Sequence, residues 1–286
     1  MAHSLLLSAL FAVPVVWAQE CTLQFDGRVP ADFAVADFDA ANDLFNADNV
    51  LGEGLAFSDL IQLPAAGASI FDIDTVPLGV TISDDSIFNG QTGFRRAELI
   101  PASNSGTDDS TVGVKTLHFS ISKDPLRPLN LEHEYQLVFL ESNDFSTNQV
   151  VLKTGTVLGG ATAGEDPDSL FLFGNVNEAA PGLLFSTPFT EGVVHNFGIV
   201  LDFDALTTQV LYSVDSDPLE AQTDAIDNDV SGQGQFHFGL LKKPIDTPAG
   251  GDITKEGTQE AGIDEGVVYG GIFQEDSSDG CISLSP

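Results

Sequence analysis

The segment from residue 93 to residue 102 holds the side chains of this sequence that are best placed to do chemistry. It reads GFRRAELIPA, and because side chains alternate along an extended strand, Arg96 and Glu98 lie on one face. A neighbouring guanidinium favours the charged form of a carboxylate, and a positioned carboxylate can transfer protons. By itself such a pair is an ordinary solvated ion pair, so its meaning depends on which groups lie beside it.

Three other segments alternate in the same way and present polar side chains opposite an apolar set. These segments are residues 117–121, 133–141 and 234–241. Their outward-facing polar residues are His118, Glu134, Gln136, Gln235 and His237. If the four strands neighbour one another, these side chains join Arg96 and Glu98 along one polar groove.

The rest of the sequence indicates the scaffold that would position this groove. Short runs rich in β-branched and aromatic residues recur from residue 68 to residue 273, separated by Gly, Pro, Asn and Asp. Only residues 31–45 could hold a short helix. The pattern predicts an all-β fold, a jelly-roll β-sandwich of two curved antiparallel sheets, whose concave face suits an extended ligand.

The first eighteen residues are typical of a secretory signal, with an apolar run from residue 5 to residue 16 followed by the small-residue site Val16-Trp17-Ala18. We therefore expect a secreted, extracellular protein whose residues 19–286 form a single domain. The only two cysteines, Cys21 and Cys281, lie at opposite ends of this domain. An oxidising compartment permits their pairing, so we predict a disulfide that ties the termini together.

The charge of the chain restricts its partners. Ten basic and 43 acidic residues give a formal net charge of −33. This charge repels polyanions, so nucleic acid, anionic membrane surfaces and uronate polysaccharides are disfavoured. A neutral polymer could approach without that electrostatic cost.

Six blocks of the sequence read CTLQFDGRVPADFAVADFD, GFRRAELIPA, TLHFSISKDPLRPLNLEHEYQLVF, ESNDFSTNQ, VHNFGIVLDFD and YGGIFQEDSSDGC. Together they span residues 21–281 and resemble glycoside hydrolase family 131. The resemblance implies a secreted fungal β-glucanase with a jelly-roll catalytic domain, which hydrolyses β-1,3, β-1,6 and β-1,4 bonds of glucan with inversion at the anomeric carbon. Such an enzyme needs no cofactor. We also expect no metal site, and a monomer.

The same resemblance indicates the catalytic residues. Glu98 comes from the FRRAEL block, Glu141 from HEYQLVFLESND and His237 from QFHFG. Hydrolysis of a glycosidic bond needs one carboxylic acid to protonate the leaving oxygen and a second group to prepare the nucleophile. Glu98 is assigned as the general acid, although Arg96 would favour its ionised form and hence the role of base, so the two roles can be exchanged. The remaining polar residues of the groove are expected to bind substrate: Arg96, His118, Glu134, Gln136 and Gln235.

The position of Glu141 depends on an interruption of its strand. Simple alternation places it in register with Leu137 and Phe139, which we assign to the core. A β-bulge near Phe139 would turn Glu141 into the groove, and bulges gather near active sites. Without a bulge, Glu134 is the better second carboxylate. We favour Glu141 because of the resemblance.

Two other functions remain open from the sequence. A non-catalytic carbohydrate-binding sandwich could bind glucan with the same polar face. A polysaccharide lyase could use arginine, glutamine and histidine side chains to remove a proton from a uronate, although the negative charge of the chain disfavours that substrate. The only tryptophan, Trp17, lies in the signal segment. A sugar-binding groove would therefore stack sugars on Phe or Tyr, such as Phe94 or Tyr212.

Overall fold

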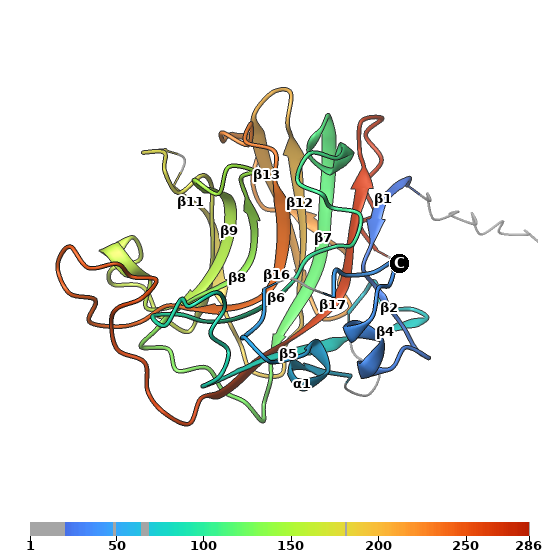
Figure 1. The fold of residues 1–286 in the computed structure, drawn as a ribbon. Helices are drawn as coiled ribbons and strands as arrows, with labels where there is room; N and C mark the ends of the chain where they lie inside the picture. The colour runs from blue at the N-terminus through green and yellow to red at the C-terminus, as the bar shows by residue number, and fades with distance from the viewer. Residues whose placement is uncertain (1–20, 48–49, 64–68, 181, 286) are drawn as a thin grey trace, which may run out of the picture.

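The computed structural model describes residues 21–47, 50–63, 69–180 and 182–285. Two antiparallel sheets pack face to face, which confirms the predicted all-β sandwich (Figure 1). The larger sheet contains β1 (Leu23–Asp26), β3 (Ile61–Gln62), β5 (Leu78–Ser83), β7 (Val114–Lys123), β12 (His195–Asp202), β13 (Thr207–Val214), β14 (Glu220–Ala221), β15 (Ile226–Asp227) and β17 (Asp264–Asp276). The smaller sheet contains β6 (Arg95–Leu99), β8 (Glu134–Glu141), β9 (Asn148–Gly155), β10 (Ser169–Phe173), β11 (Leu183–Pro188) and β16 (Gln235–Lys242).

Little helix accompanies the sheets. A two-stranded ribbon joins β2 (Val29–Pro30) to β4 (Thr75–Val76). The short helical elements are α1 (Phe57–Leu60) and the 3₁₀ turns η1 (Val35–Asp39), η2 (Asp109–Thr111) and η3 (Leu158–Gly160). The predicted helix within residues 31–45 is thus reduced to η1. Among the described residues, no helix has both the length and the apolar character needed to cross a membrane.

The strand order of the smaller sheet decides which polar residues can meet. It runs β11-β10-β9-β8-β16-β6, so the strands that carry Glu141, His237 and Glu98 are consecutive neighbours. In the larger sheet β7 lies between β12 and β17. The strand of His118 therefore belongs to the opposite layer of the sandwich.

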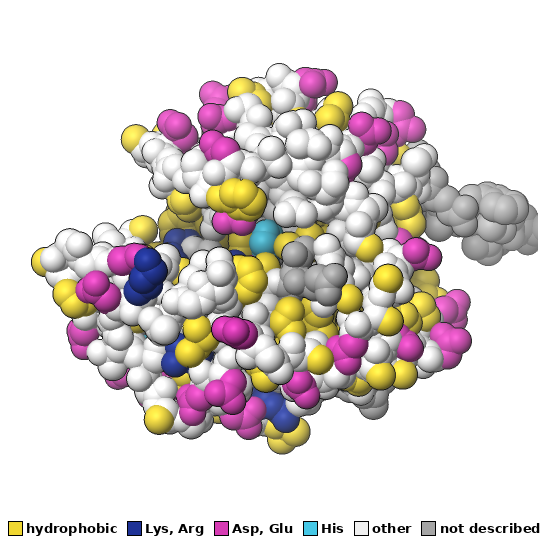
Figure 2. Space-filling model, viewed as in Figure 1, with side chains coloured by type: hydrophobic (Ala, Val, Ile, Leu, Met, Phe, Trp, Pro, Cys, Tyr) yellow, Lys and Arg dark blue, Asp and Glu magenta, His cyan; other side chains and the backbone are white. Residues whose placement is uncertain are grey.

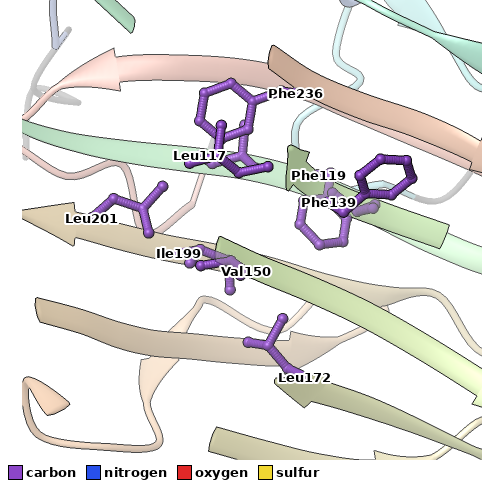
Figure 3. A pocket seen from close by; sticks show the side chains of 10 residues that line it. Leu117, Phe119, Phe139, Val150, Leu172, Ile199, Leu201 and Phe236 are labelled. Atoms are coloured by element: carbon purple, nitrogen blue, oxygen red, sulfur yellow. The ribbon is translucent and has the colours of Figure 1, made fainter. Parts of the chain in front are cut away.

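Apolar side chains from both sheets fill the space between them (Figure 3). Leu117 and Ile199 of the larger sheet face Val150, Leu172 and Phe236 of the smaller sheet. The packing leaves an apolar void of only ≈ 10 Å³. Burial of each such side chain stabilises the fold by about 1.5–3 kcal/mol, so this layer holds the two sheets together.

Irregular register in β8 and β16 changes which side chains face outward. The pairing of β8 shifts between Gln136 and Val138, so that Leu137 and Val138 both pack in the central core. Phe139 is buried as predicted, but it belongs to a separate, smaller apolar cluster and not to the central core. The bulge proposed near Phe139 is present, and Glu141 follows Phe139 onto the outer face because side chains alternate after it.

A buried tyrosine stabilises both irregular strands. Tyr269 of β17 reaches across the sandwich, and its hydroxyl lies 2.7 Å from the carbonyl oxygen of Leu137 and 2.8 Å from that of Gly239. Both carbonyls belong to the irregular stretches of β8 and β16. Gly239 allows a close approach to β6, because a Cβ there would lie 2.0 Å from the Ala97 carbonyl oxygen. The larger sheet thus supports the conformation of the strands that carry the polar groove.

The termini are joined as the sequence predicts. Cys21 and Cys281 form a disulfide across 260 residues of sequence separation. The cross-link restricts the unfolded chain and keeps β1 next to the C-terminal end of β17, with which it pairs. The predicted signal segment, residues 1–18, lies outside the described residues.

Candidate active site

The outer face of the smaller sheet carries the candidate site. In the space-filling view the molecule is hollowed over β8, β16 and β6, and a histidine, acidic and basic side chains are visible in the hollow (Figure 2). Cross-strand pairing sets these groups beside one another. Gly239, two residues after His237, pairs with Glu98, and Gln235, two residues before it, pairs with Glu141. His237 therefore lies between the two glutamates.

Glu98 is a fully buried carboxylate with strong partners. The Arg96 guanidinium donates two hydrogen bonds to it, Nε to Oε1 and Nη2 to Oε2, both at 2.7 Å. Arg96 itself is held by the Gln91 side chain at 3.1 Å and lies over the Phe88 ring. Burial opposes the charge on Glu98, but Arg96 and His237 outweigh that effect and hold the pKa of Glu98 below its ordinary value. Glu98 is therefore a carboxylate in the folded protein.

His237 connects the two acidic groups. Its Nδ1 lies 2.7 Å from Glu98 Oε2, and its ring stacks on Phe139 with the centroids 4.4 Å apart. Because an ionised carboxylate only accepts hydrogen bonds, Nδ1 carries the proton and donates it to Glu98. Nε2 is then left as the acceptor, and it has no hydrogen-bond partner among the described residues. Nε2 lies 3.6 Å from Glu141 Oε2.

Glu141 differs from Glu98 in its surroundings. Its side chain is 27% exposed, whereas that of Glu98 is completely buried. Burial raises the pKa of Glu141 above its ordinary value, and His237 and Arg96 offset this only in part. The site therefore contains an ionised carboxylate and a carboxyl group that tends to keep its proton, one on each side of an imidazole.

Comparison with known proteins identifies the family. Residues 23–280 match the profile of the glycoside hydrolase 131 catalytic N-terminal domain. The chain belongs to glycoside hydrolase family 131. One similar solved structure is a family 131 β-glucanase catalytic domain from Podospora anserina, which is 22% identical over 92% of this chain and 98% of that chain, with a TM-score of 0.71. Another is a family 131 catalytic domain from Coprinopsis cinerea, which is 23% identical over 93% of this chain and 98% of that chain, with a TM-score of 0.70. A search of curated proteins found no match.

The family 131 chain brings most of the predicted residues to this face. Arg96, Glu98, His237 and Glu141 form a chain of successive contacts. Gln235 is paired with Glu141 across the strands, and its side chain donates a hydrogen bond to the Asn104 carbonyl oxygen at 2.7 Å. Gln136 accepts a hydrogen bond from the Asn148 side chain at 2.9 Å. These two amides lie along the same strands as the acidic groups, so both remain candidate substrate contacts.

Glu134, the alternative second carboxylate, has a different environment. It is buried between Lys153 at 3.0 Å and Lys243 at 2.8 Å, and it accepts a hydrogen bond from the backbone N–H of Leu158. Burial opposes its charge, but the two lysines lower its pKa. Glu134 is thus fixed as an ion-pair partner, and the contact with His237 belongs to Glu141.

His118 does not belong to the groove, and the prediction that it binds substrate there was wrong. It lies on β7 in the other sheet, fully buried, with Nε2 2.8 Å from Glu275 and its ring stacked on Phe273. Alternation correctly places His118 on a non-core face. That face belongs to the other sheet, and alternation within one strand contains no information about which sheet the strand joins.

Several residues of the site were missed by sequence reasoning. Phe139 supports the His237 ring, Gln91 and Phe88 hold Arg96, and two lysines neutralise Glu134: Lys153 and Lys243. The alternation that assigned Phe139 to the core ignores the bulge, and no single-residue signal indicates the other contacts. Within the described ranges, no group of three or more His, Cys, Asp or Glu side chains is arranged to hold a metal ion.

Proposed function

We propose that this family 131 protein is a secreted β-glucanase that hydrolyses β-1,3, β-1,6 and β-1,4 bonds of neutral glucans with inversion. One observation carries the proposal: Glu98 and Glu141 lie on either side of His237, and their surroundings push their pKa values in opposite directions. Two titratable groups whose pKa values are separated in this way divide the roles of base and acid between them.

Glu141 acts as the general acid. Its raised pKa lets it keep its proton to a higher pH than an ordinary glutamate, and its partial exposure lets it reach the glycosidic oxygen. As the bond between the anomeric carbon and that oxygen breaks, the proton passes from Glu141 to the leaving oxygen. This assignment reverses the roles expected from the sequence, because Arg96 and His237 keep Glu98 ionised.

Glu98 acts on the base side through His237. Because Glu98 is fully buried and already bonded to Arg96 and His237, it has no free path to water. His237 Nε2 is the acceptor that remains, so it takes a proton from the attacking water while the oxygen of that water bonds to the anomeric carbon. Since Nε2 lies 3.6 Å from Glu141 Oε2, the partly exposed Glu141 side chain rotates away from His237 to leave the roughly 6.5–9.5 Å that an inverting reaction needs between base and acid. The Nδ1–H remains on Glu98, whose charge stabilises the imidazolium that forms. Attack from the face opposite the leaving group inverts the anomeric configuration.

The charges on this face support a neutral substrate. Arg96 is satisfied by Glu98, and Lys153 and Lys243 share Glu134, so these three cations have carboxylate partners inside the protein. A lyase acting on a uronate needs positive charge to neutralise the substrate carboxylate, and here that charge is already compensated. The net charge of −33 acts in the same direction.

The experiment is hydrolysis of laminarin, pustulan and cello-oligosaccharides by the purified protein, with the anomeric form of new reducing ends followed by NMR. The proposal expects α-anomers to form first from β-linked substrates. Binding without release of sugar would favour the carbohydrate-binding alternative, and absorbance of an unsaturated product from uronate polymers would favour the lyase. New reducing ends that form first as β-anomers would refute the inverting mechanism but not the β-glucanase activity.

A further inference from the structure

The hairpin that carries Glu141 ends in an exposed aromatic ring. Phe145 follows Glu141 by four residues, in the turn between β8 and β9, and is 74% exposed. Its ring makes no contact with another aromatic ring among the described residues and belongs to none of their apolar clusters. Folding alone therefore gains little from this side chain.

The backbone of Phe145 makes its exposure more informative. Its φ is +59°, in the left-handed region that disfavours bulky residues and favours glycine. Leu206 is the other bulky apolar residue with positive φ among the described residues, and it packs against the central core. The unfavourable conformation at Leu206 is offset by burial, whereas the folded chain offers no such gain at Phe145.

The turn that holds Phe145 is fixed in place. The Phe145 N–H donates to the Ser142 carbonyl oxygen at 2.8 Å, and the Asn143 N–H donates to the Gly232 carbonyl oxygen at 3.0 Å. The Asn177 side chain donates to the Ser146 carbonyl oxygen at 2.9 Å, which ties the turn to the neighbouring β10–β11 loop. The ring is therefore presented to solvent by a braced turn.

A second apolar side chain lies on that neighbouring loop. Val176 is 45% exposed, and its N–H donates to the carbonyl oxygen of Asn148 at the start of β9. Figure 2 likewise shows hydrophobic side chains at the rim of the hollow, next to its acidic side chains and histidine. The two loops thus form a small apolar surface at the end of the strands where Glu141 lies.

We propose that Phe145, flanked by Val176, is a stacking platform for a glucosyl residue of the substrate beyond the cleavage point. The apolar face of a sugar ring packs on an aromatic ring, and a fixed ring loses little entropy on binding. The other two aromatic residues considered for this role do not fit it. Phe94 is buried, and Tyr212 lies on β13 of the other sheet, where its hydroxyl contacts His195 at 2.7 Å. The inference rests on the proposed function, since it names a subsite of that reaction.

The test measures binding apart from turnover. Affinity electrophoresis in gels that contain laminarin compares Glu98→Gln alone with the same chain carrying Phe145→Gly, Phe145→Trp or Leu126→Ala. Glycine removes the ring while it suits the positive φ, so loss of folding does not explain a loss of binding. Leu126 is a matched control, 81% exposed in the connection at the other end of β8.

We expect Phe145→Gly to weaken laminarin binding about 5- to 10-fold, as loss of one aromatic stacking contact implies, and Phe145→Trp to change it less than about 2-fold. Leu126→Ala should match the parent. In the active chain, Phe145→Gly should raise KM with kcat nearly unchanged. Unchanged binding by Phe145→Gly overturns the stacking role even if the wild type hydrolyses glucan. The proposed function, and the subsite with it, are overturned if laminarin does not slow the migration of Glu98→Gln in the gel and the wild type releases no sugar.

Discussion

Two pairs of histidine and glutamate, one on each sheet, have nearly the same local geometry. His237 lies 2.7 Å from Glu98 and stacks on Phe139 at 4.4 Å, whereas His118 lies 2.8 Å from Glu275 and stacks on Phe273 at 4.5 Å. Both histidines are buried. The local motif alone therefore cannot explain why only one pair is a candidate site.

The difference lies in what surrounds each pair. The second ring nitrogen of each histidine is buried without a hydrogen-bond partner among the described residues. That of His237 lies 3.6 Å from a carboxylate oxygen of the partly exposed Glu141, whereas the His118 ring packs against the rings of Phe71 and Phe273. Glu275 is capped by the Ser283 N–H and hydroxyl, next to the disulfide residue Cys281. The pair on the smaller sheet thus adjoins a partly exposed carboxyl group. The pair on the larger sheet fixes the C-terminal segment to the fold.

The largest expected effect separates the two glutamates. Glu98→Gln should lower kcat by about 10³- to 10⁴-fold, because the imidazolium loses the charge that stabilises it. Glu275→Gln should leave kcat within about 2-fold of the wild type, since the pair on the larger sheet lies outside the groove. Both values come from initial rates on laminarin. A loss of kcat in Glu275→Gln as large as that in Glu98→Gln would remove the functional distinction between the pairs.

The second largest effect is expected for Glu141→Gln, which should lower kcat by about 10²- to 10³-fold. Activity needs Glu98 ionised and Glu141 protonated. The lowered pKa of Glu98 keeps its charge into acidic solution, and the raised pKa of Glu141 keeps its proton to higher pH than an ordinary glutamate. The wild type should therefore lose kcat/KM as the pH rises through the raised pKa, and Glu141→Gln should lack that decline.

A substrate with a good leaving group provides the control for this prediction. Dinitrophenyl β-glucosides need no protonation of the leaving oxygen, so Glu141→Gln should recover most activity on them and Glu98→Gln should not. Glu134→Gln should retain normal rates on glucan wherever it folds. Rescue of Glu98→Gln instead of Glu141→Gln would exchange the two roles.

An intermediate effect is expected where the larger sheet supports the site. Tyr269→Phe removes the hydroxyl that lies between the Leu137 and Gly239 carbonyl oxygens, and the unfolding free energy should fall by about 1–3 kcal/mol. Displacement of β8 and β16 should also lower kcat by about tenfold, since small errors in catalytic geometry are costly. Denaturant unfolding and initial rates are the measurements. Lower stability with an unchanged kcat would show that the tyrosine serves folding alone.

The smallest effect is on the pH dependence of stability. Burial lowers the pKa of His118, and the pKa of Glu275 is also lowered because His118 and Ser283 outweigh its burial. A pKa that is lower in the folded protein makes the protein more stable at high pH than at low pH. The contribution of both groups is therefore fully present above pH 6.5, the pKa of histidine in the unfolded chain, and is lost as the pH falls. His118→Gln should have a lower Tm at neutral pH and a shallower decline of Tm below pH 6.5. An unchanged slope would assign acid sensitivity to other groups.

The sequence itself determined the class of fold, the faces of the regular strands, the paired cysteines and the family. Alternation of apolar residues has a local physical cause, so it correctly placed Glu98 and His237 outside the core. The tertiary structure alone decided which outward faces meet. It placed His118 on the opposite sheet and brought Glu141 beside His237 through a bulge. Strand pairing and bulges arise from contacts between residues far apart in the chain, and the alternation within a single strand does not reveal those contacts.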